Sequence, residues 1–145
     1  MKDLFDVHCH MVPGVDDGAA DLEESLEMLK MQHEDGVRKI IITPHYRRRM
    51  FETPAKKVHE QFLKLQEAAK KEYPDIKIVM ARGNCDYTSI GADVELCEAE
   101  GYKIGVTHGH LYGVNWDTFG LEKLAFENKL SLVIYGHTHC RVCEY

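Results

Sequence analysis

Six of the nine histidines in this 145-residue chain occur as three pairs with a single residue between the partners. Each pair lies at or just after the end of an apolar run of strand length, at residues 4–9, 102–106 and 132–135. The pairs are His8/His10, His108/His110 and His137/His139. Because alternate side chains of an extended chain point to the same side, each strand end presents two imidazoles together. This pattern favours a sheet whose strand ends gather at one functional edge.

Apolar periodicity predicts that strands and helices alternate along the first half of the chain. Strands are expected over residues 4–9, 40–43 and 76–81. The first helix begins with the capping pair Asp21 and Glu24, and it stops at Gly36. Thr53 and Pro54 open the second helix as its N-cap and first-turn residue.

The second half of the chain is expected to contain a hairpin, a helix and a final strand. The segments are 94–96 and 102–106 for the hairpin, 117–128 for the helix and 132–135 for the strand. We therefore expect the α/β class, with a layered βαβαβ sheet followed by the hairpin and a further α/β unit. All of these elements are predicted to form a single domain over residues 1–145.

Charge and composition exclude several classes of protein. The chain has 18 Lys and Arg against 24 Asp and Glu, a net charge of −6, so no nucleic acid or membrane surface is expected as a partner. It contains no apolar run of 18 residues, its first residues are too polar for a signal peptide, and five cysteines make a disulfide framework improbable. We expect a cytoplasmic protein that acts on a small molecule or a protein and is compatible with an oligomer.

Nitrogen and oxygen donors follow five predicted strands. They are His8, His10, His45, Asn84, Asp86, His108, His110, His137 and His139. The carboxyl ends of parallel strands share one edge of a sheet, and ligands bind there. A lone histidine at a strand end is usually only hydrogen-bonded, but convergence from five strands favours metal binding. Imidazole with carboxylate and amide oxygens suits Mn²⁺, Fe²⁺ or Zn²⁺, and so many donors suffice for two ions.

Three arginines, Arg47 to Arg49, follow His45 closely. Guanidinium groups at this position could bind a phosphate through paired hydrogen bonds, and the alternative is a solvated basic patch. His33 and His59 lie within predicted helices, and we interpret them as structural or solvated.

The chain from Val79 onward resembles the calcineurin-like metallophosphoesterases, in particular their small phosphodiesterase branch. The matching motifs are GNCD at 83–86, THGH at 107–110 and YGHTH at 135–139. The resemblance implies that Asn84, His108, His137 and His139 are metal ligands and that Asp86 is the acid of the GNCD turn.

Residues 1–78 look like a different group, the PHP-fold tyrosine-protein phosphatases that regulate bacterial capsules. The matching stretches are DVHCHMVPGVDDGA at 6–19, TPH at 43–45 and RRRMFETP at 47–54. This second resemblance implies that His8, His10, Asp17 and His45 are metal ligands.

We interpret the chain as a hybrid with metallophosphoesterase-like topology, truncated after the last motif. In the preferred hypothesis it is a phosphodiesterase that uses a hydroxide activated by two divalent ions, with Mn²⁺ favoured and Fe²⁺, Zn²⁺ or Ni²⁺ as alternatives. Asp6, His8 and His139 would hold one ion, and Asn84, His108 and His137 the other. His45 or Asp17 would replace a missing bridging carboxylate.

The residues expected to act on a small phosphoester substrate are Asp86, His110, Arg47 and Arg48. Two alternatives stay open. The chain could be a PHP-type phosphatase of phosphotyrosine peptides, or a metal-binding scaffold domain without catalytic activity.

Overall fold

The computed structural model describes residues 3–83, 91–138 and 140–143. The chain divides into two compact units. Unit 1 comprises residues 1–81 and 85–92, and unit 2 comprises residues 82–84 and 93–145. The organisation of all 145 residues as one domain stays a prediction.

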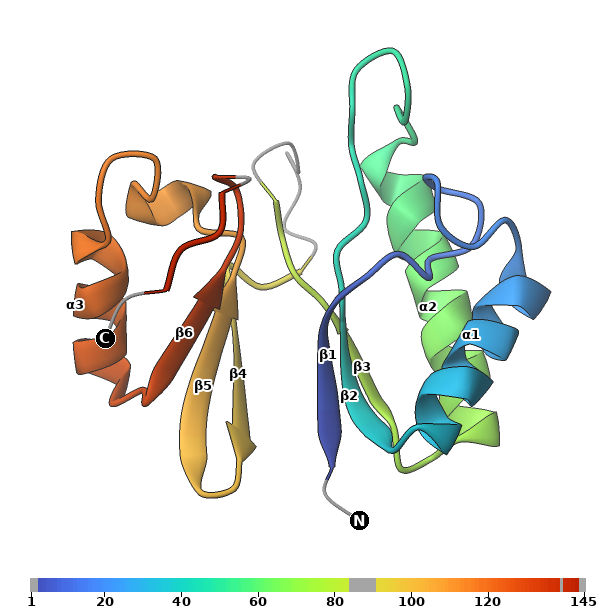
Figure 1. Cartoon of the computed structure of the whole chain (residues 1–145). Coiled ribbons are helices and arrows are strands. Elements are labelled where there is room, and N and C mark those ends of the chain that lie inside the picture. Colours follow the sequence, from blue (N-terminus) through green and yellow to red (C-terminus); the bar gives the residue numbers. More distant parts are fainter. Residues whose placement is uncertain (1–2, 84–90, 139, 144–145) are drawn as a thin grey trace. The chain divides into compact units, whose positions relative to one another are not determined.

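Unit 1 is a three-stranded parallel sheet covered by two helices (Figure 1). Its elements are β1 (Leu4–Cys9), α1 (Leu22–Glu34), β2 (Val37–Ile42), α2 (Ala55–Glu72) and β3 (Lys77–Met80). The strand order is β1-β2-β3, and both pairs are parallel. The strands follow one another across the sheet in chain order, and both helical connections have the same hand. Both helices therefore lie on one face of the sheet, as Figure 1 shows.

The core of unit 1 lies between the sheet and the helices. The three consecutive isoleucines of β2, Ile40 to Ile42, are fully buried, as expected for a parallel strand. Ile40 and Ile42 belong to the same cluster as Leu29 of α1 and Leu65 of α2. Because strand side chains alternate, Ile41 points to the opposite face of the sheet.

The start of α1 confirms the predicted capping pair. The Asp21 carboxylate accepts a hydrogen bond from the backbone N–H of Glu24 at 3.0 Å. The Glu24 side chain in turn accepts from the backbone N–H of Ala20 at 2.7 Å. Two backbone donors at the helix start are thereby satisfied.

The prediction that Thr53 caps α2 is wrong. The helix begins at Ala55 with Pro54 as its N-cap residue, and no side chain caps it. The Thr53 hydroxyl instead donates to the backbone carbonyl of Val15 at 2.8 Å. That carbonyl lies in an irregular loop and needs a partner, so the hydroxyl serves a tertiary contact rather than the helix end.

Unit 2 is a mixed three-stranded sheet with one α-helix. Its elements are β4 (Val94–Ala99), β5 (Tyr102–Thr107), the short 3₁₀ turn η1 (His110–Tyr112), α3 (Phe119–Asn128) and β6 (Leu132–Tyr135). β5 is central, antiparallel to β4 and parallel to β6. The predicted hairpin turn at Glu100-Gly101 is confirmed, because both residues have positive φ, as a two-residue type I′ turn requires.

The α/β class predicted from the sequence is confirmed, with one parallel and one mixed sheet. The βαβαβ part forms the parallel sheet of unit 1, and the hairpin pairs with β6 in the mixed sheet of unit 2. Among the described residues, no helix has both the length and the apolar character needed to cross a membrane.

Candidate metal centre

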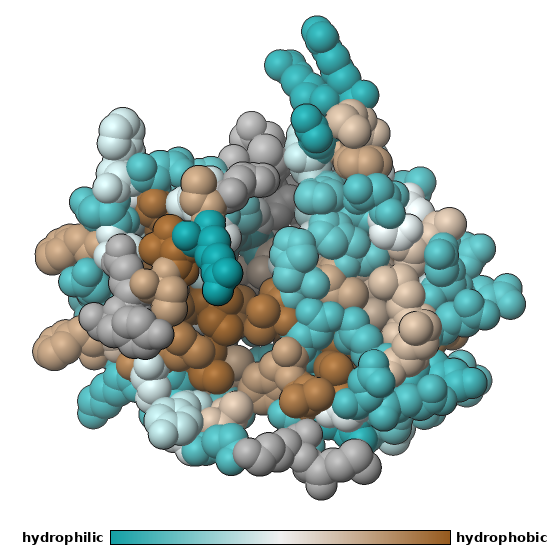
Figure 2. Space-filling model, viewed as in Figure 1, coloured by the Kyte–Doolittle hydropathy of each residue, from teal (hydrophilic) through white to brown (hydrophobic). Residues whose placement is uncertain are grey.

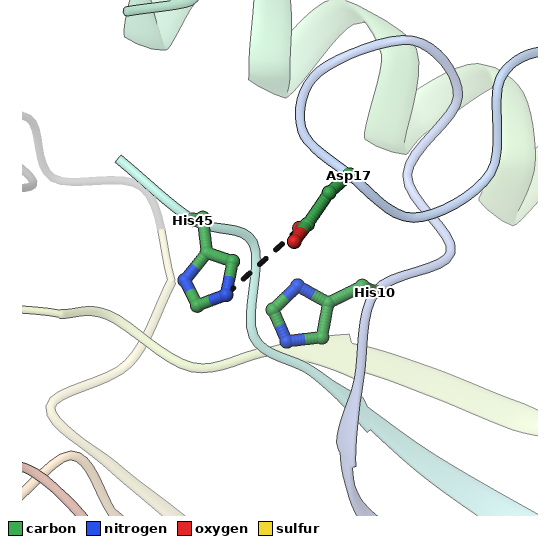
Figure 3. A group of neighbouring side chains, drawn as sticks. All are labelled: His10, Asp17 and His45. Atoms are coloured by element: carbon green, nitrogen blue, oxygen red, sulfur yellow. Dashed lines mark ion pairs between the residues drawn. The ribbon is translucent and has the colours of Figure 1, made fainter. Parts of the chain in front are cut away.

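Three side chains of unit 1 bring metal-ligating atoms together: His10, Asp17 and His45 (Figure 3). One ligand atom from each lies within 4.8 Å of the others, and His45 Nε2 is 3.9 Å from Asp17 Oδ1. His10 and Asp17 come from the loop after β1, and His45 follows β2. Metal–nitrogen bonds are about 2.1 Å long, so ligands on opposite sides of an ion lie about 4.2 Å apart. The group therefore fits a divalent ion after small side-chain movements.

His8 lies next to this group. Its Nε2 atom is 3.1 Å from His10 Nε2. Two ligand atoms bound to one ion lie about 3.0–3.4 Å apart when the bonds are about 2.1 Å long and the geometry is octahedral or tetrahedral. The Thr43 hydroxyl lies 3.2 Å from the other ring nitrogen of His8 and fixes the ring orientation. His8 is thus close enough to His10 to share an ion with it, but it is not among the residues whose ligand atoms all lie within 4.8 Å of one another.

Electrostatics favours the neutral form of His8. Desolvation of its ring lowers the pKa of His8, and the neighbouring rings of His10 and His45 lower it further. The negative charge of Asp6 raises the pKa of His8, but its effect is the smallest of the four. Only a neutral imidazole can bind a metal ion, so this environment prepares His8 for that role.

Asp16 is the residue that sequence analysis missed. Its side chain is fully buried and accepts three hydrogen bonds. Oδ2 accepts from His10 Nδ1 at 3.0 Å and from the backbone N–H of His45 at 2.7 Å, and Oδ1 accepts from the backbone N–H of Gly18 at 3.0 Å. A carboxylate bound to Nδ1 leaves His10 Nε2 free for a metal. The signal was the Asp-Asp-Gly sequence, in which the first aspartate forms a turn with the residue two positions on.

Gly18 is required by the close folding of the loop after β1. A Cβ atom at this position would overlap the backbone carbonyl of His10. The same carbonyl accepts a hydrogen bond from the N–H of Ala19 at 3.1 Å, which draws the two sides of the loop together. The loop can therefore place His10 and Asp17 side by side only with glycine at this position.

Asp6 accepts two hydrogen bonds within unit 1. Its Oδ1 accepts from the backbone N–H of His8 at 3.0 Å, and its Oδ2 accepts from Gln32 at 2.6 Å. Both oxygens are thus engaged in holding the strand end. The ligand role of Asp6 stays a prediction.

The arginine segment forms a tight loop between β2 and α2. Arg47 and Phe51 pair in antiparallel fashion, with two backbone hydrogen bonds of 2.9 and 2.8 Å. Arg47, Arg48 and Arg49 are all exposed. The Phe51 ring lies parallel to the His45 ring, with 6.0 Å between centroids, so the base of this loop adjoins the metal-ligating group.

Unit 2 carries a second group of histidines. His108 Nδ1 lies 3.2 Å from His110 Nδ1, and the rings of His108 and His137 are 4.9 Å apart between centroids. His137 has φ of 72°, a left-handed conformation that turns the chain just after β6. The sequence analysis did not select Asn115, whose Nδ2 lies 3.0 Å from His137 Nε2.

Three predicted site residues lie outside the described part of the chain: Asn84, Asp86 and His139. The combination of donors from both halves into one dinuclear site also stays a prediction.

Comparison with known proteins identifies the family. The family model for capsular polysaccharide synthesis proteins CpsB/CapC matches residues 4–112. The chain belongs to this family. The match includes every residue of the unit 1 group and continues beyond residue 78, where the sequence analysis ended the phosphatase-like segment.

Among relatives of this CpsB/CapC chain is the tyrosine-protein phosphatase CpsB of Streptococcus pneumoniae, which is 44% identical over 75 residues. The aligned part is 52% of this chain and 31% of the relative, so the chain spans about a third of that protein. The probable metallophosphoesterase YsnB of Bacillus subtilis is 35% identical over 60 residues, which are 41% of this chain and 36% of YsnB.

A solved structure shares the fold across both halves. The Vps29 protein of Chaetomium thermophilum superposes with a TM-score of 0.53 at 17% identity, covering 99% of this chain and 66% of Vps29. Both resemblances stated from the motifs, to capsule-type phosphatases and to metallophosphoesterases, are confirmed by these matches.

Proposed function

We propose that the chain is a metal-dependent phosphoester hydrolase that acts on phosphotyrosine, with its reaction centre in unit 1. The observation that carries the proposal is the group of ligand atoms from His10, Asp17 and His45, all within 4.8 Å of one another. Relatedness to CpsB of S. pneumoniae, named a tyrosine-protein phosphatase, supports the choice of substrate. This was the first alternative in the sequence analysis, and it now precedes the phosphodiesterase hypothesis.

The proposed division of labour follows from the contacts in unit 1. His8, His10, Asp17 and His45 would hold the metal, which would supply Lewis-acid polarisation of a phosphoryl oxygen. Asp16 fixes the His10 ring and the backbone at His45 through its hydrogen bonds. Arg47, at the base of the adjoining loop, would bind the non-bridging oxygens of the phosphate. The phenol of tyrosine has a pKa of about 10, which makes it a good leaving group for such a site.

The metal is proposed to be Mn²⁺, with Fe²⁺, Zn²⁺ or Ni²⁺ as alternatives. Imidazole nitrogens together with carboxylate oxygens suit this group of ions. The number of ions, one or two, belongs to the same proposal.

Hydrolysis of phosphotyrosine by the full chain tests this function. Protein stripped of metal with a chelator receives Mn²⁺, and released inorganic phosphate is measured. We expect turnover that requires added metal and that falls to background in His10→Ala. His33→Gln is the matched control, because the His33 side chain contacts Asp75 and Tyr73, neither of which belongs to the group, and it should retain full turnover. Turnover by His10→Ala equal to that of the unaltered chain would contradict the proposal.

A second candidate function rests on the histidines of unit 2. His108, His110 and His137 lie close together, and a probable metallophosphoesterase is among the relatives. This candidate is hydrolysis of phosphodiesters. It predicts metal-dependent hydrolysis of bis(para-nitrophenyl) phosphate that is lost in His137→Ala and kept in His10→Ala. The reverse pattern would reject it.

A further inference from the structure

The loop between β2 and α2 concentrates positive charge in an acidic chain. Residues 46–51 contain three arginines and no acidic residue. Without these arginines the chain would have 15 basic residues against 24 acidic ones, a net charge of −9. Figure 2 shows hydrophilic side chains projecting where Figure 1 places this loop. A negatively charged partner would therefore be attracted to this loop and repelled by much of the remaining surface.

The arginines are available for such a partner. Among the residues that the structure describes, the ion pairs include neither Arg47, Arg48 nor Arg49. Arg38, by contrast, lies 3.0 Å from Asp75 and is already neutralised by it. Three adjacent exposed guanidinium groups repel one another, and an anionic ligand would relieve that repulsion.

The loop is held in a defined position beside the metal-ligating group. Its base is closed by the hydrogen bonds between Arg47 and Phe51. Thr53 then ties the chain to the carbonyl of Val15, in the loop that also carries Asp17. Arg49 has φ of 68°, and the chain reverses there, so Arg48 and Arg49 form the tip while Arg47 stays at the base.

We propose that the tip of this loop, Arg48 and Arg49, docks acidic residues next to the phosphotyrosine of a protein substrate. The inference rests on the proposed function and specifies its substrate class as acidic phosphotyrosine segments. Arg47 lies at the base of the loop, where the proposed function assigns it to the scissile phosphate, whereas Arg48 and Arg49 lie at the tip and are assigned to the flanking residues. Tyr46 and Met50 are 40% and 59% exposed and offer apolar contact to the same segment.

Relative rates on three peptides test the docking. Each peptide has a central phosphotyrosine, flanked by glutamates, by serines or by lysines, and kcat/KM is measured with the Mn²⁺-loaded full chain at low salt. Two exposed ion pairs should favour the acidic peptide over the neutral one by about threefold to tenfold, through KM rather than kcat. Added salt should reduce this ratio because the charges are exposed.

A charge-reversal pair makes the test specific to the loop. In Arg48→Glu/Arg49→Glu the acidic peptide should lose its advantage over the neutral one. Lys70→Glu/Lys71→Glu, in the last turn of α2, changes the net charge equally and should keep the advantage. The proposal would be overturned if the loop variant Arg48→Glu/Arg49→Glu kept the ratio of kcat/KM between the acidic and the neutral peptide. It would also be overturned if the helix variant Lys70→Glu/Lys71→Glu lost that ratio.

Binding measured without turnover separates this inference from the proposed function. Fluorescence anisotropy of the labelled acidic peptide is followed with metal-free protein, with the loop variant and with the helix variant. Binding that depends on the loop, without hydrolysis of any peptide, would reject the proposed function and support the docking site. Hydrolysis of all three peptides at equal rates would support the proposed function and reject the docking site. Loop-dependent binding to phosphatidylserine vesicles, with no peptide preference, would also overturn the proposal.

Discussion

Asp16 and Asp17 are neighbours in the sequence but differ in their physical environment. The Asp16 side chain is fully buried and accepts hydrogen bonds from both sides of the site, whereas the Asp17 side chain is 58% exposed. The sequence analysis selected Asp17 because the family pattern gives it a ligand role. The Asp-Asp-Gly sequence indicates a turn at Asp16, but it does not predict that the side chain is buried, because burial depends on how the whole loop folds.

We therefore expect different effects on the free energy of unfolding when each aspartate is changed to asparagine. Asp16→Asn replaces one carboxylate oxygen with an NH₂ group that cannot accept, so either the His10 and His45 donors or the Gly18 N–H loses its acceptor. We expect a loss of about 1–3 kcal/mol in the free energy of unfolding, measured by urea denaturation of metal-free protein. Mn²⁺ affinity should fall about tenfold to a hundredfold.

Asp17→Asn serves as the contrasting variant. Its free energy of unfolding should stay within about 0.5 kcal/mol of the unaltered chain, because the side chain is exposed. Its Mn²⁺ affinity should fall, because a carboxylate ligand is lost. Equal stability of the two variants would contradict the structural role of Asp16.

At the scale of elements, the strands and the capped helix could be predicted from local signals. The apolar run at residues 4–9 forms β1, Asp21 with Glu24 marks the start of α1, and Glu100-Gly101 marks the hairpin turn. Thr53 shows where local signals fail. Its residue type fits an N-cap, but its hydroxyl meets a carbonyl 38 positions earlier in the chain, which no local pattern reveals.

The contact of Thr53 yields a prediction about the entry to α2. Thr53→Val keeps the shape of the side chain and removes the hydroxyl, leaving the Val15 carbonyl without this donor. The free energy of unfolding should fall by about 1 kcal/mol in urea denaturation. Thr53→Ser, which keeps the hydroxyl, should recover most of the loss, and failure to do so would point to the methyl group instead.

A second element contact links the end of α1 to the turn before β3. Asp75 lies 3.0 Å from Arg38 and 3.1 Å from His33. The hydrogen bond from His33 is the main cause that lowers the pKa of Asp75. A lowered pKa means that the unfolded chain binds the proton more readily, so the contribution to stability is present above the unfolded pKa and is lost as pH falls through the folded value.

Asp75→Asn should therefore be slightly less stable than the unaltered chain near neutral pH. The two urea midpoints should converge as pH falls through the acidic range where Asp75 takes up its proton. A difference that persists unchanged below that range would show that the ion pair is not its cause.

At the scale of the whole molecule, each unit carries its own group of histidines. The sequence could predict that these residues follow strands, because the apolar runs and the motifs that end them are local. Which histidines share an ion depends on the relative placement of chain segments, and the motifs do not specify it. His10 and His45 belong to one unit, and His108 and His137 to the other.

Binding of a metal should stabilise the chain as a whole. Free Mn²⁺ at one hundred times its dissociation constant stabilises the folded state against unfolding by about 2.7 kcal/mol. For a chain of this length the expected rise in Tm is roughly 5–10 °C, reversed by a chelator. The absence of any Tm change at saturating Mn²⁺ would contradict a metal centre formed in the folded state.

The central claim is that unit 1 holds the functional metal, and the most direct test is Mn²⁺ binding followed by electron paramagnetic resonance of the free ion. Metal-free full chain, His45→Ala and His137→Ala are titrated in parallel. The account predicts that His45→Ala loses the tightest binding event and that His137→Ala keeps it. Tight binding that survives His45→Ala and disappears in His137→Ala would place the metal in unit 2 and contradict the account.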